Sequence, residues 1–479
     1  MSDLRKKTIS GFLFKFLERA GAQGIKFFVS LLLARLLVPE EFGLISLVSV
    51  FINICDVFVT YGFGSSLVAD KNSDSVDFST CFFFGVALSL LIYLAIFLTA
   101  PIIAGFYKQE ALTSLLRVMA LRIPIAAVNS VQHAYVSKHM MFKKFFYATL
   151  IGTVISGVIA VVMAFAGFGV WALVEQYLGN VILDTICLWI IVGWRPTAAF
   201  SFERLKKIYS YGWKILAVGL IDTGYSQLRS LIIGKKYSPG DLAYYNRGND
   251  FPTTIMSLVE PTVNGVLFPA LSQCRDDQAE MRTITRRVIQ VSTFIMFPMM
   301  IGLAAVAKPL VVVLLTEKWL PSVIYLQIGC IAYMIRPLQF INNSVIKASG
   351  RSDLLLKLDI LKKSIGVILL LAAMKYGVIG IAVSMVVIYF ISAIINIAPN
   401  RSILGYGYRA QLRDIAVNLG LALAMGAVVY SLSFITLPAA WLLILQIAAG
   451  AAVYLTLSSV FKVDSFWFLL KSGRKLFER

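Results

Sequence analysis

The sequence predicts an all-α polytopic membrane protein with about fourteen transmembrane helices. Of the 479 residues, 59% are apolar and only 14% are charged, whereas roughly a quarter of the residues of a soluble domain carry a charge. The mean hydropathy is +0.81. Apolar runs follow one another along the chain, and each is long enough to cross a bilayer core, which needs about 20 residues. Lipid is therefore the main solvent, and no segment remains for a sizeable soluble domain.

The polar breaks between the apolar runs define the expected helices. Their even number places both termini on one side of the membrane. The expected spans lie near residues 10–36, 41–69, 79–104, 112–136, 145–167, 169–193, 209–234, 241–272, 284–313, 322–348, 353–375, 377–399, 411–436 and 439–461.

The net charge of +19 follows this topology. Basic residues gather in the breaks on the side of the termini, for example at Lys143 and Lys144 and at Arg286 and Arg287, whereas the opposite breaks hold few. Loops rich in lysine and arginine remain in the cytoplasm. We therefore expect a multi-pass protein of the bacterial inner membrane with both termini in the cytoplasm, and no binding to nucleic acid.

Two sets of segments recur along the chain. Pro39-Glu-Glu-Phe-Gly43, after the first span, is echoed by Pro239-Gly-Asp-Leu-Ala243, after the seventh. Arg122-Ile-Pro124 in the fourth span is echoed by Arg336-Pro337 in the tenth. We infer two pseudo-symmetric six-helix lobes, related by an axis along the membrane normal, with two helices appended. The expected parts are a first lobe over 1–193, a cytoplasmic linker over 194–208, a second lobe over 209–400, two C-terminal helices over 401–462 and a basic tail over 463–479.

Several spans carry charged residues that share one helical face. An ionisable group inside a span costs a few kcal/mol, so it normally faces a protein interior or a water-filled cavity. At 100° per residue, Lys15, Arg19 and Lys26 fall within about a 40° arc. Similar stripes occur in spans 4, 7, 8 and 10, with a smaller one in span 2, and we expect these faces to line one hydrated cavity.

The fixed charge of this expected cavity is net positive, which favours an anion and repels organic cations. Arginine binds phosphate oxygens with two donors at once, and side-chain amides bind sugar hydroxyls. The predicted anion-binding residues are Lys15, Arg19, Lys26, Arg122, Arg229, Arg247 and Arg336. The predicted sugar-binding residues are Asn129, Gln339, Asn342 and Asn343. The candidates for sodium or proton coupling are Glu18, Asp56, Asp222, Asp250 and Glu260.

Each of these residues also has a structural interpretation. Lysines near a helix end can extend to the interface without any role in binding. Arg19 can pair with Glu18, and Arg247 with Asp250. Glu260 precedes Pro261, so this position can equally mark a helix kink. The five cysteines lie singly, without a C-x-x-C pair, so we expect no metal site and no cofactor.

Short segments in a fixed order give the chain a family resemblance. It resembles the polysaccharide-exporter (Wzx-type, colanic-acid-exporter-like) branch of the multidrug/oligosaccharidyl-lipid/polysaccharide flippase superfamily. The segments are Lys7-Thr-Ile-Ser-Gly11, Ala34-Arg-Leu-Leu37 with Phe42-Gly43, Tyr61-Gly-Phe-Gly64, Leu267-Phe-Pro-Ala-Leu271, Phe297-Pro298 and Glu317-Lys-Trp319.

This resemblance implies a V-shaped pair of six-helix lobes that moves an undecaprenyl-pyrophosphate-linked oligosaccharide to the outer leaflet. The expected mechanism is alternating access through the cationic central cavity, in a monomer that contacts membrane lipids and polysaccharide polymerase or assembly proteins. The family supplies no short binding motif, so the site residues rest on the helical-face argument alone.

Three other functions remain open. A drug or cation antiporter of the same superfamily would have twelve spans and an acidic pocket. A membrane polysaccharide polymerase or glycosyltransferase would have a substantial outer loop or an acidic catalytic motif, neither of which the sequence contains, so we expect no enzyme. A lipid scramblase or structural assembly protein is not distinguished by sequence.

Overall fold

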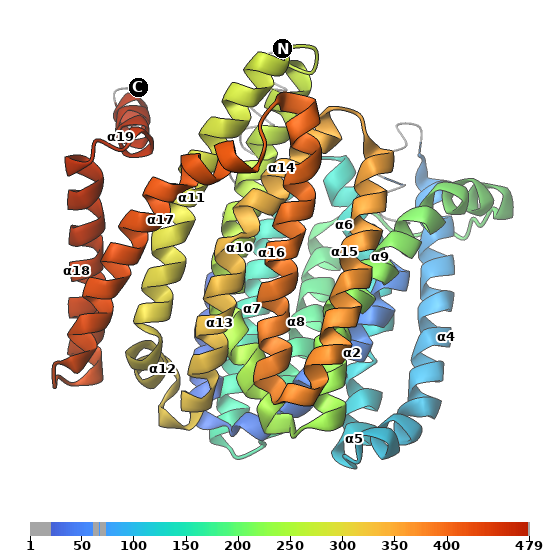
Figure 1. The fold of residues 1–479 in the computed structure, drawn as a ribbon. Coiled ribbons are helices and arrows are strands. Elements are labelled where there is room, and N and C mark those ends of the chain that lie inside the picture. Colours follow the sequence, from blue (N-terminus) through green and yellow to red (C-terminus); the bar gives the residue numbers. More distant parts are fainter. Residues whose placement is uncertain (1–20, 61–66, 68–72, 478–479) are drawn as a thin grey trace. The chain divides into compact units, whose positions relative to one another are not determined.

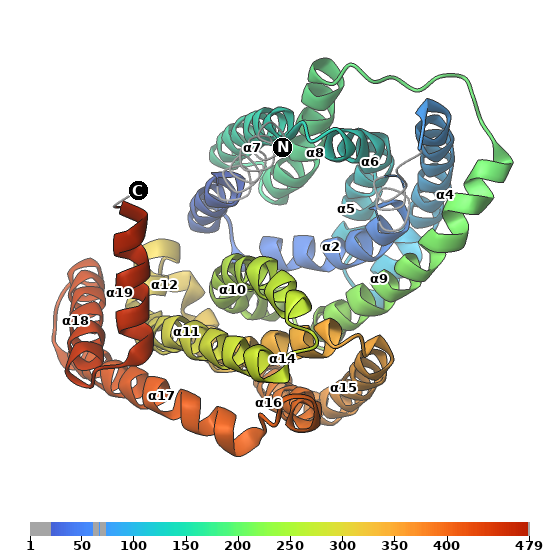
Figure 2. The same ribbon diagram turned by 90° about the horizontal axis from the view of Figure 1, so that it is seen from above.

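The computed structural model describes residues 21–60, 67 and 73–477, and these residues form helices, turns and connecting loops without any strand. The chain divides into two compact units, residues 1–243 and 244–479. Figure 1 shows the helices along the chain, and Figure 2 shows them from above.

The first unit is built from long helices joined by short turns. The hairpin of α7 and α8 is its most extensive helix pair, and α9 packs against α2 and α4. The helices are a first helix over 21–36, α2 (Pro39–Thr60), α4 (Ser75–Tyr107), α5 (Ala111–Met119), α6 (Arg122–Lys138), α7 (Phe142–Phe165), α8 (Val170–Ile191) and α9 (Phe202–Lys236).

In the second unit, α11 packs against α17, and α15 pairs with α16. Its first helix, α10, begins five residues before the boundary between the units. The helices are α10 (Pro239–Gln273), α11 (Gln278–Ala305), α12 (Ala307–Leu315), α13 (Val323–Met334), α14 (Arg336–Ala348), α15 (Ser352–Ala373), α16 (Gly377–Leu404), α17 (Tyr408–Ser431), α18 (Ala439–Val460) and α19 (Asp464–Phe477).

The all-helical membrane fold is confirmed. Within the described ranges, 11 helical stretches are long and apolar enough to cross a membrane. One of them, Ser352–Leu404, holds both α15 and α16. When α15 and α16 are counted separately and the polar helix α9 and the helix over 21–36 are added, the helices are consistent with the expected fourteen spans. The lobe boundaries predicted from sequence remain a prediction.

The repeated segments at 39 and 239 begin α2 and α10 in the same way. Each helix starts at a proline, which needs no N–H partner there. The carboxylate of Glu41 accepts the N–H of Val38 at 3.1 Å, and that of Asp241 accepts the N–H of Ser238 at 3.1 Å. The two starts also touch, because a Cβ added to Gly43 would lie 1.8 Å from the carbonyl oxygen of Pro239. Only glycine fits at residue 43.

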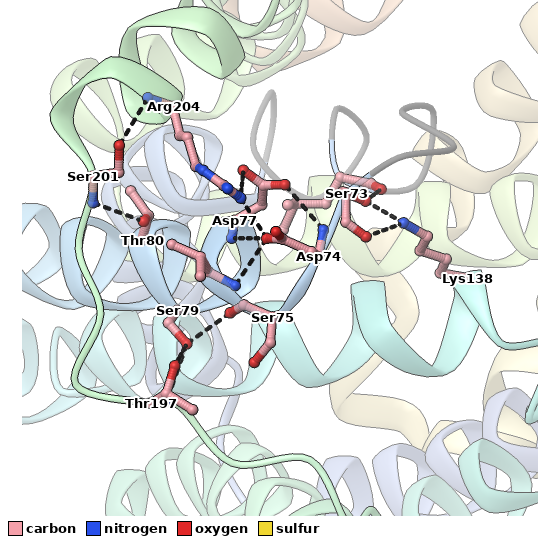
Figure 3. Close-up of polar contacts among 12 residues, drawn as sticks. Ser73, Asp74, Ser75, Asp77, Ser79, Thr80, Lys138, Thr197, Ser201 and Arg204 are labelled. Carbon is pink, nitrogen blue, oxygen red and sulfur yellow. Dashed lines mark hydrogen bonds and ion pairs between the residues drawn. The ribbon is translucent and has the colours of Figure 1, made fainter.

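The start of α4 holds the connection between α8 and α9 (Figure 3). Asp74 caps α4 by accepting the N–H of Val76 at 3.0 Å and of Asp77 at 3.1 Å. The guanidinium of Arg204, in the first turn of α9, bonds Asp74 and lies 3.3 Å from the carboxylate of Asp77. These contacts fix the first turn of α9 to α4.

The backbone of the connection is held to α4 as well. Thr197 donates its N–H to Ser79 Oγ at 3.0 Å, and Ser201 donates its N–H to Thr80 Oγ1 at 3.2 Å. Together with the bonds of Arg204, these two form what we call the α4–α9 clasp. Hydrogen bonds from Arg204 and from the backbone lower the pKa of Asp74 to about 2.

Substitution of Gly43 by alanine should destabilise the protein. The added methyl group would overlap the Pro239 backbone, which cannot move aside as a flexible side chain can. We expect a loss of about 1–3 kcal/mol in the free energy of unfolding, measured as a lower melting temperature of the purified protein. Gly85→Ala is the control, because a Cβ there meets nothing within 4 Å. Equal melting temperatures for the two variants would contradict the close contact.

Loss of the Arg204 charge should open the α4–α9 clasp. In Arg204→Gln, we expect hydrogen exchange at the amides of Thr197 and Ser201 to rise about twofold to fivefold, the range for an exposed ion pair. The substitution Lys206→Gln, at an exposed neighbour, should leave the exchange rates of these amides unchanged.

The α4–α9 clasp should also depend on pH. Because the pKa of Asp74 is lowered in the folded protein, the contribution of its carboxylate to stability is complete above the ordinary pKa of aspartate. That contribution is lost only as pH falls from about 4 to 2. Protection that disappears between pH 8 and 5, after correction for intrinsic rates, would refute this assignment.

Candidate functional site

The fourth and tenth expected spans, which correspond in the repeat, are broken helices; the ninth is also interrupted, between Ala305 and Ala307. The fourth is interrupted between Met119 and Arg122, where α5 ends and α6 begins, and the tenth between Met334 and Arg336, where α13 ends and α14 begins. Proline follows each break, at Pro124 and Pro337. Since proline has no N–H for the carbonyl four residues earlier, it favours an interruption there. Interrupted helices in corresponding positions of two halves are a feature of transporter binding sites.

An arginine begins the second segment of each broken helix and pairs with a carboxylate. Arg122 Nη2 lies 3.4 Å from Asp56 Oδ2 of α2. Arg336 Nη2 lies 2.7 Å from Glu260 Oε2 of α10. By the internal repeat, the second span corresponds to the eighth and the fourth to the tenth. Each half of the chain therefore holds the same kind of ion pair between corresponding helices, α2 and α6 in the first half and α10 and α14 in the second.

The two arginines retain unused hydrogen-bonding capacity. Nε of Arg122 and Nε of Arg336 are buried and have no hydrogen-bond partner among the described atoms, and the same holds for Oδ1 of Asp56. The Arg336 guanidinium also lies 5.7 Å from the ring of Tyr389. A planar guanidinium with free donors suits an anion that offers several oxygens, such as a phosphate.

Arg247 and Arg229 are more deeply buried, with 7% and 8% of their surfaces exposed. Arg247 lies 3.4 Å from Asp250 and over the ring of Trp319, at 5.2 Å, in agreement with the interpretation that it pairs with Asp250. For Arg229, Nε has no hydrogen-bond partner in the described part of the chain. Lys26 and Asp222 are exposed. Lys15, Glu18 and Arg19 lie outside the described residues.

Gln339 and Asn342 serve in helix packing. Gln339 donates to the carbonyl of Tyr389 in α16 at 2.6 Å. The side chains of Asn342 and Gln411 exchange two hydrogen bonds of 2.9 Å, which join α14 to α17. Both amides are buried and already hydrogen-bonded to other helices. Asn343 is half-buried, and its Oδ1 has no hydrogen-bond partner among the residues described.

Asn129 leads to a residue that the sequence analysis missed. Its amide donates to Asp184 of α8 at 2.7 Å, and Thr149 of α7 donates to the same carboxylate at 3.2 Å. Nε2 of His133 lies 3.3 Å from Asp184. Asp184 and Glu175 are the two acids of the apolar run 170–191, and such acids are a visible signal. Because they lie on opposite helical faces, they form no stripe of charges. Asn129 and His133 are thus held in an interhelical cluster.

Comparison with known sequences gives a consistent set of relatives. The family described as "Polysaccharide biosynthesis protein" matches residues 32–324, more than half of the chain. The teichuronic acid biosynthesis protein TuaB of Bacillus subtilis is 25% identical over 84% of this chain and 84% of its own length. The lipopolysaccharide biosynthesis protein WzxC of Escherichia coli is 23% identical over 90% of this chain and 89% of its own. The succinoglycan biosynthesis transport protein ExoT of Rhizobium meliloti is 27% identical over 63% and 61%.

Solved structures give the same fold. The lipid II flippase MurJ, in an inward closed conformation, superposes with a TM-score of 0.76 at 15% identity, over 95% of this chain and 99% of its own. An inward-facing multidrug transporter of the MATE family gives a TM-score of 0.62 at 17% identity, over 81% and 94%. The Wzx-type resemblance and the flippase-like fold are confirmed. These relatives and neighbours are named for polysaccharide biosynthesis, transport or flipping, as expected for a transporter.

Proposed function

Because the chain belongs to the polysaccharide biosynthesis protein family, we propose that it is a flippase for a lipid-linked oligosaccharide with an anionic head, such as undecaprenyl pyrophosphate. The observation that carries this proposal is the pair of equivalent arginine–carboxylate contacts, Arg122 with Asp56 and Arg336 with Glu260, at the breaks of two corresponding helices. In this proposal the two arginines bind the pyrophosphate or acidic sugars, and the lipid tail stays in the bilayer.

The carboxylates neutralise the arginines before cargo binds, and they are released when it binds. Without cargo, each arginine is neutralised by its acid, so neither charge is left alone in a poorly solvated place. An incoming pyrophosphate competes for the guanidinium and releases the acid. A released Asp56 or Glu260 would then favour a bound proton or sodium ion. Cation coupling is thus part of the proposal, and alternating access is its expected mechanism.

A drug antiporter of the same superfamily is the second candidate, since its fold also superposes. The anion-binding arginines argue against it, because positive charge at a binding site raises the energy of a bound organic cation. The family and the named polysaccharide relatives also favour a glycan cargo. A polymerase or assembly protein would be a partner in this proposal.

Loss of the arginine charge should abolish most of the flipping. In proteoliposomes with an undecaprenyl-pyrophosphate-linked oligosaccharide, we expect Arg336→Ala and Arg122→Ala each to slow translocation about tenfold or more, since a charge-assisted bond is worth about 1.5–3 kcal/mol. Arg336→Lys should fall between wild type and Arg336→Ala, because lysine keeps the charge but loses the planar donors. The control is Arg409→Ala, an exposed arginine at the start of α17.

A double variant separates loss of binding from loss of folding. Arg336→Ala leaves Glu260 unpaired, whereas Arg336→Met combined with Glu260→Gln removes both charges and should restore the melting temperature. We expect this double variant to fold and still fail to flip the substrate. Normal flipping by the double variant would refute an anion-binding role for Arg336.

A further inference from the structure

The C-terminal segment forms a helix that runs crosswise to α18. Within the expected basic tail over 463–479, residues Asp464–Phe477 form α19. The chain turns sharply after α18 at Lys462, whose φ is 49°. Figure 1 shows α18 lengthwise and α19 nearly end-on, and Figure 2 shows the reverse, so the two helices lie crosswise. Since α18 is a candidate span, this crosswise arrangement would place α19 along the membrane surface.

One side of α19 is anchored to the rest of its unit. Val463 and Ser465, at its start, are buried. The ring of Phe466 lies 6.4 Å from that of Phe294 in α11. The guanidinium of Arg287, also in α11, lies 4.8 Å from the ring of Phe468. The helix is thus part of the folded unit and has a fixed outer side.

That outer side combines apolar and basic groups. Trp467 is 43% exposed and Leu470 is 47% exposed, and Lys471 is exposed beside them. At 100° per residue, these three side chains fall within about a 100° arc of the helix. Tryptophan and leucine beside lysine on one face are typical of helices that lie in the membrane interface.

Basic residues outnumber acidic ones around this face. Lys462 and Arg287 are exposed next to α19, in addition to Lys471, whereas Asp464 is the one acid in Lys462–Lys471. The sequence continues with Arg474 and Lys475. Anionic headgroups at a membrane surface attract such a cluster, and the attraction weakens with salt.

We propose that α19, together with Lys462 and Arg287, is a binding surface for the headgroups of anionic phospholipids. Trp467 and Leu470 enter the boundary between headgroups and acyl chains, and the basic side chains contact the lipid phosphates. This inference does not depend on the transported cargo. It assigns the face to lipid, and a protein docking on it is the competing outcome of the test below.

Tryptophan quenching by brominated lipids tests the assignment in the intact protein. The chain is placed in nanodiscs that contain brominated phosphatidylglycerol or, at equal mole fraction, brominated phosphatidylcholine. The difference between the wild type and Trp467→Phe gives the quenching of Trp467, and the same procedure with Trp441→Phe gives the control. Trp441 is 65% exposed at the opposite end of α18, so both residues can be replaced without disturbing buried tryptophans such as Trp319.

We expect brominated phosphatidylglycerol to quench Trp467 about twofold more than brominated phosphatidylcholine, in the direction given by the surface charge, and to quench Trp441 equally with both. Replacing Lys462, Lys471 and Arg287 together by glutamine should remove the preference and leave quenching by phosphatidylcholine. An absence of quenching at Trp467 with either lipid would overturn the proposal in favour of a protein or water environment. Equal quenching by the two lipids would overturn the specificity for anionic headgroups.

Discussion

The contact between Arg336 and Glu260, repeated by Arg122 and Asp56, is the interaction on which the candidate site depends. An arginine in a membrane helix needs an opposite charge, because lipid does not solvate it. A buried ion pair nevertheless adds little net stability, since desolvation offsets much of the attraction, and apolar residues of similar volume often serve as well. Stability alone therefore does not explain why two such pairs stand in corresponding places. A site that must accept an anion, and must stay neutral without it, does explain them.

The broken helices explain why these arginines differ from the others. Arg247 belongs to the continuous helix α10, and its charge is occupied by Asp250 and the face of Trp319. Arg122 and Arg336 instead begin a helical segment after an interruption. Their position at the breaks, with Nε atoms that are unpaired among the described residues, sets these two arginines apart from Arg247.

Sequence reasoning could predict the helices and the repeat, because hydropathy and the segments at 39 and 239 depend on local composition. It also identified Arg122 and Arg336 as corresponding residues of the internal repeat, and in the structure both begin the second segment of a broken helix. It did not place the breaks. Pro252 and Pro261 were equally visible, yet both lie inside the continuous α10. Whether a proline interrupts a helix depends on the neighbouring helices that satisfy its freed carbonyl, and one sequence does not reveal them.

The roles of individual polar residues were harder to predict for the same reason. Asn342 and Gln411 are 69 residues apart and become partners only through the packing of α14 on α17. A helical-face argument identifies the side on which Asn342 lies, but it does not distinguish a partner helix from a cavity. Asp184 shows the converse, because it has no other charge on its helical face and forms no stripe, yet it receives hydrogen bonds from two other helices.

The two ion pairs are equivalent in position but not in strength, and this difference bears on how a flippase with both would work. Arg336 and Glu260 approach to 2.7 Å, with similar exposure of 30% and 28%. Arg122 and Asp56 are separated by 3.4 Å, and only 13% of the Asp56 side chain is exposed. The looser pair leaves more of the Arg122 charge for an incoming anion, whereas releasing Asp56 exposes a less solvated carboxylate. In the proposed mechanism, cargo that binds Arg122 would therefore break a weaker ion pair than cargo that binds Arg336. The released Asp56 would depend more strongly than Glu260 on a bound cation to neutralise its charge.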